Sequence, residues 1–213
     1  REPQYKPLMH ANPLRFDYVE HPARELLEEL AQAVEAEPYQ RGVICRELFD
    51  DDDAVMILRM GAEERILGFA ALRSIRVAEL YSALGSREQA DYIRNQAAGR
   101  LLLLTGLFKA QGSFDTEQLL LTEVLARALN EECSYGLFCP RDGSMRSATI
   151  ETMQRQGFVR TPDIEGARPA MLVDMRSPVV LLQNMETAIK APFSTNERVL
   201  EAVRLAHRRL QTA

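Results

Sequence analysis

The densest group of side chains that could do chemistry is a run of four aspartates at residues 50–53. Neighbouring carboxylates can bind a metal ion or a cationic amine, because both ligands carry positive charge. A charge run of this kind is more often a solvated loop between two regular elements, and we favour that interpretation. The sequence therefore predicts an exposed acidic loop here and no metal site.

Neither the histidines nor the cysteines have the spacing of a metal site. The histidines are His10, His21 and His207, and the cysteines are Cys45, Cys133 and Cys139. Three cysteines without a short paired spacing indicate neither a disulfide framework nor a zinc site, so reduced thiols and a cytoplasmic location are expected. Cys139 ends a predicted strand, where it is either a thiol acid or, as we favour, a buried structural residue.

The elements that must position any site begin with an apolar run at residues 101–104. The run continues with Leu107 and Phe108, and it lacks helical spacing, so it predicts a buried strand. Thr105 and Gly106 interrupt the run. The interruption is either a β-bulge or a plain break in the strand.

A helix, a strand and a shorter helix follow this strand. The first helix is predicted over residues 116–132, because apolar residues recur on one face and Asp115 with Gln118 resembles a capping box. The next strand covers residues 135–139. The shorter helix ends near residue 156, where Gly157 suits a left-handed C-terminal cap, and Phe158 starts a further strand.

This order of elements, which ends on Gly157 and Phe158, resembles the cofactor half of the GCN5-related N-acetyltransferase (GNAT) superfamily. The resemblance implies an α/β (α+β) fold with a mixed, mostly antiparallel central sheet flanked by helices. In that family the strand pairs by its backbone with the pantetheine arm of acetyl-CoA, and the following loop and helix N-terminus hold the pyrophosphate. Unpaired N–H groups and the positive end of the dipole make a helix N-terminus suitable for an anion.

The resemblance implies a set of acetyl-CoA-binding residues in this chain. They are Leu107, Phe108, Lys109, Gln111, Gly112, Ser113 and Thr116. The family loop places small residues where this chain has Phe114 and Thr116, and Asp115 and Glu117 put two negative charges near the predicted pyrophosphate. Lys109 and Arg141 are cations that could compensate for these charges.

Two functions remain open from the sequence. The first is acetyl-CoA-dependent N-acyl transfer to an amine, on a small molecule or a peptide, through positioning of the thioester against the acceptor. The second is a degenerate module that keeps the fold and serves only in binding. Many family members have a tyrosine as general acid where this chain has Met153, which cannot donate a proton, and no catalytic residue is assigned.

The remaining elements are predicted from local patterns. Leu14, Phe16 and Tyr18 alternate as in a half-buried strand, and an apolar stripe after Pro22 predicts a helix. A further helix is predicted at residues 39–48. A hairpin at residues 54–60 and 65–72 and a last strand at 170–173 complete the sheet. Residues 74–99 form an insertion, which is expected to cover the open side of the sheet and to shape the acceptor or partner surface.

Composition restricts the classes of partner. The 213 residues carry a formal net charge of −5, which argues against nucleic acid or an anionic membrane as the main partner. No apolar stretch approaches the roughly 20 residues that span a bilayer. The chain starts with Arg1, so we expect a processed or excised piece.

We expect two regions, a GNAT-like domain at residues 1–176 and a linker with a C-terminal amphipathic helix at 177–213. A capping box at Ser194 and Glu197 starts that helix. Its valine and leucine stripe would be exposed in isolation. The helix is therefore expected to dock on the domain, in a homo-dimer or on a further domain.

Overall fold

A seven-stranded sheet runs through the part of the chain that the computed structural model describes, which is residues 14–36, 49–61, 64–110, 116–141, 143 and 145–177. The strands are β1 (Leu14–Val19), β2 (Ala54–Met60), β3 (Arg65–Arg76), β4 (Arg100–Lys109), β5 (Tyr135–Phe138), β6 (Val159–Arg160) and β7 (Met171–Asp174). Their order is β1-β2-β3-β4-β5-β7-β6, and every neighbouring pair is antiparallel except β4 and β5. The predicted mixed, mostly antiparallel sheet is confirmed.

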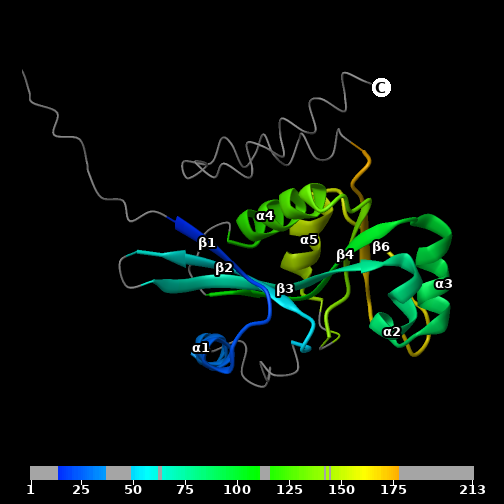
Figure 1. Cartoon of the computed structure of the whole chain (residues 1–213). Helices are drawn as coiled ribbons and strands as arrows, with labels where there is room; N and C mark the ends of the chain where they lie inside the picture. Colours follow the sequence, from blue (N-terminus) through cyan, green and yellow to red (C-terminus); the bar gives the residue numbers. More distant parts are fainter. Residues whose placement is uncertain are drawn as a thin grey trace, which may run out of the picture.

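Helices cover both faces of this sheet (Figure 1). They are α1 (Arg24–Glu35), α2 (Leu80–Leu84), α3 (Arg87–Gln96), α4 (Thr116–Asn130) and α5 (Ser147–Arg155), with a short 3₁₀ helix, η2 (Val77–Glu79), before α2. Helix α4 is the crossover that two parallel strands require, and it connects β4 to β5. Helices α4 and α5 lie on one face and α1 lies on the other.

Alternating side chains divide the core between the two faces. The α4–α5 face includes Met56, Leu72 and Leu104 from the central strands, packed with Leu120 and Val124 of α4. The opposite face carries two smaller apolar clusters. One lies under α1 and the other under α2 and α3.

The local signals in the sequence explain several of these boundaries. Ser86 caps α3, since its Oγ accepts a hydrogen bond from the Gln89 N–H at 3.3 Å. Gly157 has a φ of 91°, the left-handed conformation predicted at the end of α5. The hairpin of β2 and β3 is confirmed, although β3 extends to Arg76 and therefore includes the first residues of the expected insertion.

The inserted segment forms η2, α2 and α3 and covers part of the face opposite to α4 and α5. Leu80, Leu84 and Ile93 from these helices are buried against Leu101 and Leu137 of β4 and β5. The segment therefore supplies part of the core. Its expected influence on an acceptor stays a prediction.

Some predicted elements lie outside the described residues. These are the N-terminal lead-in, the helix at residues 39–48, the loop at 111–115 and the C-terminal helix after Ser194, together with the region 177–213 beyond its first residue.

Candidate functional site

Strand β4 contains a bulge at Thr105, just where it leaves β5. The two strands pair from Leu101 to Leu104, and the register between β3 and β4 shifts at the same point, so that Thr105 has no partner. The carbonyl oxygens of Leu104 and Thr105 both face β5, since they accept hydrogen bonds from Cys139 N–H at 2.9 Å and Arg141 N–H at 3.0 Å. Two successive carbonyls on one side mark a bulge, so the bulge alternative of the sequence is confirmed.

Beyond the bulge, residues 106–109 pair with β3, and no described strand pairs with their other side. The N–H of Ala110 donates to Leu67 O of β3 at 2.8 Å. Because backbone groups alternate along a strand, Leu107 directs its N–H and C=O away from β3, as does Lys109. This is the strand edge to which the sequence assigns the pantetheine arm.

The N-terminus of α4 packs closely on this strand. Thr116 is 1% exposed, and its Oγ1 has no hydrogen-bond partner among the described residues. A Cβ at Gly68 of β3 would lie 2.6 Å from Phe108 O and 2.7 Å from Thr116 Cγ2. Glycine at this position therefore lets the helix start approach β3 and β4.

The predicted acetyl-CoA residues fall into two groups. Gln111, Gly112 and Ser113 lie outside the described residues, as do Phe114 and Asp115 of the same loop. The other group comprises Leu107, Phe108, Lys109 and Thr116, and the side chains of Phe108 and Thr116 are both buried. Contact with a ligand at Thr116 is therefore restricted to its backbone atoms, while the backbone N–H and C=O of Phe108 face β3. The assignment as a whole stays a prediction.

A group of charged and polar side chains around the buried Asp53 adjoins the bulge. We call it the charged cluster, and its members are Asp50, Asp53, Arg73, Thr105 and Arg141. Asp53 is 0% exposed, so the solvated-loop interpretation of the aspartate run is wrong for this residue, although Asp51 and Asp52 are exposed. Asp53 Oδ2 accepts hydrogen bonds from Arg141 Nη2 and from Asp50 N–H, both at 2.9 Å.

Arg73 and Thr105 complete the cluster. Thr105 Oγ1 lies 3.4 Å from Asp53 Oδ2 and 3.4 Å from Ala71 O, so its hydroxyl can donate to either oxygen. Arg73 Nε lies 3.8 Å from Asp53 Oδ1, and its Nη1 lies 3.6 Å from Asp50 Oδ2. Arg141 also pairs directly with Asp50, so it is engaged by the cluster rather than available to a pyrophosphate.

The pKa values of the two aspartates in the cluster are shifted in opposite directions. Burial raises the pKa of Asp53, while the Asp50 N–H and the charges of Arg141 and Arg73 act against this shift. The hydrogen bond from Arg141 lowers the pKa of Asp50, whose side chain is 49% exposed. Asp50 therefore places a stable negative charge at the surface end of the cluster.

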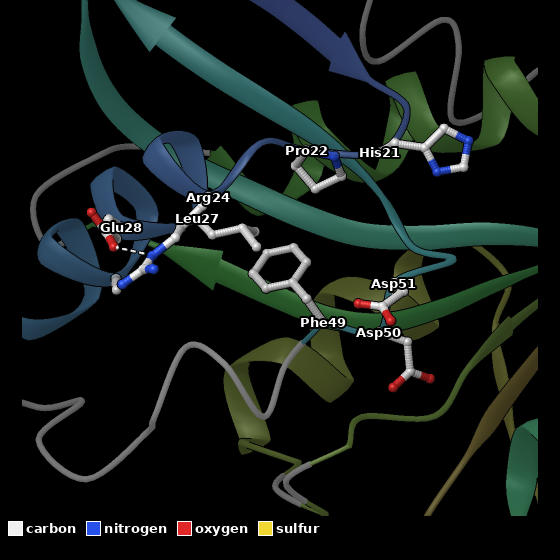
Figure 2. Close-up of a pocket in the computed structure, with 9 residues that line it drawn as sticks. His21, Pro22, Arg24, Leu27, Glu28, Phe49, Asp50 and Asp51 are labelled. Carbon is white, nitrogen blue, oxygen red and sulfur yellow. Dashed lines mark hydrogen bonds and ion pairs between the residues drawn. The ribbon is translucent and has the colours of Figure 1, made fainter.

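A pocket of about 520 Å³ opens beside this end of the cluster (Figure 2). Its apolar lining residues are Pro22, Leu27, Ala31 and Phe49, and its polar lining residues are His21, Arg24, Glu28, Asp50 and Asp51. Figure 2 shows Leu27 of α1 facing the Phe49 ring, with the two aspartates at one end. We call this the α1 pocket. Asp50 belongs both to the pocket and to the charged cluster. The pocket is therefore connected with the bulge through Asp50 and Asp53, which contacts Thr105.

Two further residues that the sequence analysis considers, Cys139 and Met153, belong to the core. Cys139 is buried in the cluster under α2 and α3, where burial raises the pKa of its thiol, as the structural interpretation predicts. Met153 is fully buried beneath α4. Among the described residues, no group of three or more His, Cys, Asp or Glu side chains could hold a metal ion.

Sequence reasoning missed Asp53, Arg73 and Arg141 as a unit. They come from the loop before β2, from β3 and from the segment after β5. The one available signal was the position of Asp53 directly before a strand with an entirely apolar start, since a residue at that place is carried into the core by the strand.

Several solved structures share this architecture. Polyamine N-acetyltransferase of Drosophila melanogaster aligns with a TM-score of 0.55 and 11% sequence identity, over 76% of this chain and 99% of that chain. Arylalkylamine N-acetyltransferase 2 of Aedes aegypti aligns with a TM-score of 0.52 and 9% identity, over 77% of this chain and 100% of that chain. Tetrahymena GCN5 aligns with a TM-score of 0.50 and 14% identity, over 76% of this chain and 96% of that chain.

These alignments establish the fold. No protein-family model matches the sequence, and no curated protein matches it significantly. The chain has the fold of the GCN5-related N-acetyltransferases, as the resemblance in the sequence predicts, and is a divergent example of it. No helix within the described ranges is both long and apolar enough to cross a membrane.

Proposed function

We propose that this protein transfers an acyl group, with acetyl-CoA as the expected donor, to a primary amine. The observation that carries the proposal is the parting of β4 from β5 at the Thr105 bulge, which the charged cluster connects with the α1 pocket. The similar solved structures include enzymes named for polyamine and arylalkylamine acetylation, which agrees with this reaction class.

The donor side of the proposal rests on the strand edge at residues 106–109. An extended pantetheine arm can add to such an edge as a further strand would, with hydrogen bonds to the outward N–H and C=O of Leu107. The thioester would then lie near the bulge. Glu117 of the first turn of α4 accepts a hydrogen bond from Thr149 Oγ1 at 3.0 Å, so part of its charge is already engaged.

The acceptor side rests on the α1 pocket. Leu27 and Phe49 offer apolar contact to the body of an amine, while Asp51 attracts its ammonium group. Arg24 pairs with Glu28 at 2.8 Å within the same pocket, so that pair is electrically neutral. Asp50 is likewise paired with Arg141, so the exposed carboxylate of Asp51 defines the charge that an incoming acceptor meets.

The reaction requires the neutral amine to attack the thioester carbonyl carbon. The C–N bond forms as the C–S bond breaks, the nitrogen loses one proton, and the departing thiolate takes up one proton. Met153 cannot serve as the acid, since its side chain is buried and has no ionisable proton. We therefore assign most of the rate enhancement to placing the two reactants together.

The test is titration of CoA into the protein by calorimetry, followed by a thiol-release assay with acetyl-CoA and a panel of agmatine, phenylethylamine and a short peptide. We expect CoA binding and thiol release with at least one amine. Leu107→Pro removes the outward N–H without removing a hydrogen bond to β3, and it should weaken CoA binding by roughly tenfold. Leu107→Ala keeps that N–H and is the matched control. Absence of both CoA binding and thiol release in the wild type would refute the proposal.

A second candidate function is a binding module without acyl transfer. The burial of Met153 favours it, because the usual position of the general acid has become part of the apolar core. The two candidates differ in one measurement. An amine that binds to the α1 pocket in calorimetry, with no thiol release at any pH between 7 and 10, would support the binding module.

A further inference from the structure

The charged cluster joins four segments that are distant in the sequence. Asp50 and Asp53 precede β2, Arg73 lies in β3, Thr105 is the bulged residue of β4, and Arg141 follows β5. By strand alternation, Asp53 shares a sheet face with Val55, on the side opposite to α4 and α5. The cluster therefore lies on the same side of the sheet as the α1 pocket.

A buried carboxylate of this kind is costly to retain. Asp53 Oδ1, Arg73 Nε and Arg141 Nε are buried and lack a hydrogen-bond partner among the described residues. An apolar residue of similar size often stabilises a fold as well as or better than a buried ion pair. A function beyond stability is the simplest reason for keeping such a group beside the bulge.

The cluster holds the bulged residue at two points. The Thr105 hydroxyl lies within reach of Asp53, and the Thr105 carbonyl accepts the N–H of Arg141, whose guanidinium is in turn bound to Asp53. In the described part of the chain, that N–H forms the last hydrogen bond between β4 and the continuation of β5. The point where the strands separate is thus fixed through one carboxylate.

We propose that Asp53 is a positioning residue, which holds Thr105 and Arg141 so that β4 keeps its bulge and the edge at residues 106–109 stays parted from β5. The inference rests on the proposed function, in which that edge receives the donor. Asp53 is not a catalytic residue in this account. It acts on the reaction only through Thr105, Arg141 and the strand that they hold.

The first experiment is hydrogen–deuterium exchange of the full chain in Asp53→Asn, Thr105→Val and the exposed control Asp52→Asn. We expect amides of the peptide covering residues 104–110 to exchange roughly tenfold faster in the first two variants, with α4 unchanged. Thr105→Ser keeps the hydroxyl and should behave as the wild type. Exchange in Asp53→Asn equal to that in Asp52→Asn would overturn the inference. An equal acceleration in α4 would also overturn it, because the role would then be general stability.

The second experiment measures acyl-transfer kinetics in the same variants. We expect kcat to fall by roughly tenfold to a hundredfold in Asp53→Asn and Thr105→Val, while KM for the amine stays unchanged and Thr105→Ser retains activity. A change in the amine KM alone would assign Asp53 to the acceptor site instead and contradict the inference. If the wild type transfers no acyl group, the proposed function fails, and the exchange experiment still decides whether Asp53 holds the strand.

Discussion

The two faces of the sheet bury their central strands with different chemistry. Beneath α4 and α5 the contacts are apolar, and Leu120, Val124 and Met153 are almost completely covered. On the opposite face, the apolar clusters under α1 and under α2–α3 leave room between them for Asp53 and its arginines. Apolar packing tolerates small shifts of the side chains. The hydrogen bonds and ion pairs of a buried carboxylate, in contrast, fix both the distance and the direction of its partners. Apolar burial therefore stabilises both faces, and the charged cluster, which we propose sets the geometry of the strand separation, belongs to the second face alone.

The largest expected effect lies on the apolar face. Leu120 is 0% exposed, so Leu120→Ala removes buried methyl groups and leaves a cavity, and it should lower the free energy of unfolding by about 2–5 kcal/mol. Urea unfolding measures the change. Leu119→Ala, at a half-buried position of the same helix, is the control and should cost less than half as much. Equal losses would mean that α4 does not anchor the fold by this face.

Arg141→Gln tests the charged cluster, again through the free energy of unfolding. It leaves Asp53 buried without its closest cation, so the free energy of unfolding should fall by roughly 3 kcal/mol. The double variant with Asp53→Asn removes both charges and should recover part of this loss. Strictly additive losses in urea unfolding would show that the two residues do not act as a pair.

Gly68 lies where the N-terminus of α4 meets β3 and β4. Gly68→Ala places a Cβ 2.6 Å from a backbone oxygen that cannot move aside, so we expect a loss of about 1–3 kcal/mol in thermal unfolding. Gly136→Ala meets the Val173 side chain at 2.9 Å, which can adjust, and should cost less. The reverse order would indicate that the start of α4 is loosely packed.

The smallest expected effect concerns pH. The folded protein lowers the pKa of Asp50, so its contribution to stability is present above the unfolded pKa of roughly 4 and is lost as pH falls through the lower, folded value. The stability difference between wild type and Asp50→Asn should therefore shrink from pH 7 toward pH 3. Its size should stay below about 1 kcal/mol, because the side chain is half exposed. Urea midpoints at pH 7, 5, 4 and 3 measure it, with Asp52→Asn correcting for the lost charge. A stability difference that stays constant from pH 7 to pH 3 would show that it does not come from the pair of Asp50 with Arg141.

The fold was largely predictable because its signals are local. The apolar run before Thr105, the helical stripe of α4 and the cap at Gly157 each lie within one element, and each appears in the structure where the sequence places it. Periodicity and caps depend on residues a few positions apart. The order of these elements was then enough to indicate the acetyltransferase fold.

The candidate site was less predictable because its contacts are distant in the sequence. Arg141 and Asp53 are 88 residues apart, and Thr105 and Asp53 are 52 apart. A run of four aspartates resembles an exposed loop, and only the strand that follows determines that one member is carried into the core. The α1 pocket likewise depends on Phe49 and Asp51 meeting α1 in space.

The sequence separation within the charged cluster also has a kinetic consequence. The hairpin of β2 and β3 forms from neighbouring segments, whereas the contact of Asp53 with Arg141 closes 88 residues and needs α4 and β5 in place. We therefore expect the cluster to form after the folding transition state. Its removal should leave the folding rate nearly unchanged and speed unfolding, so that these residues govern how long a folded molecule persists.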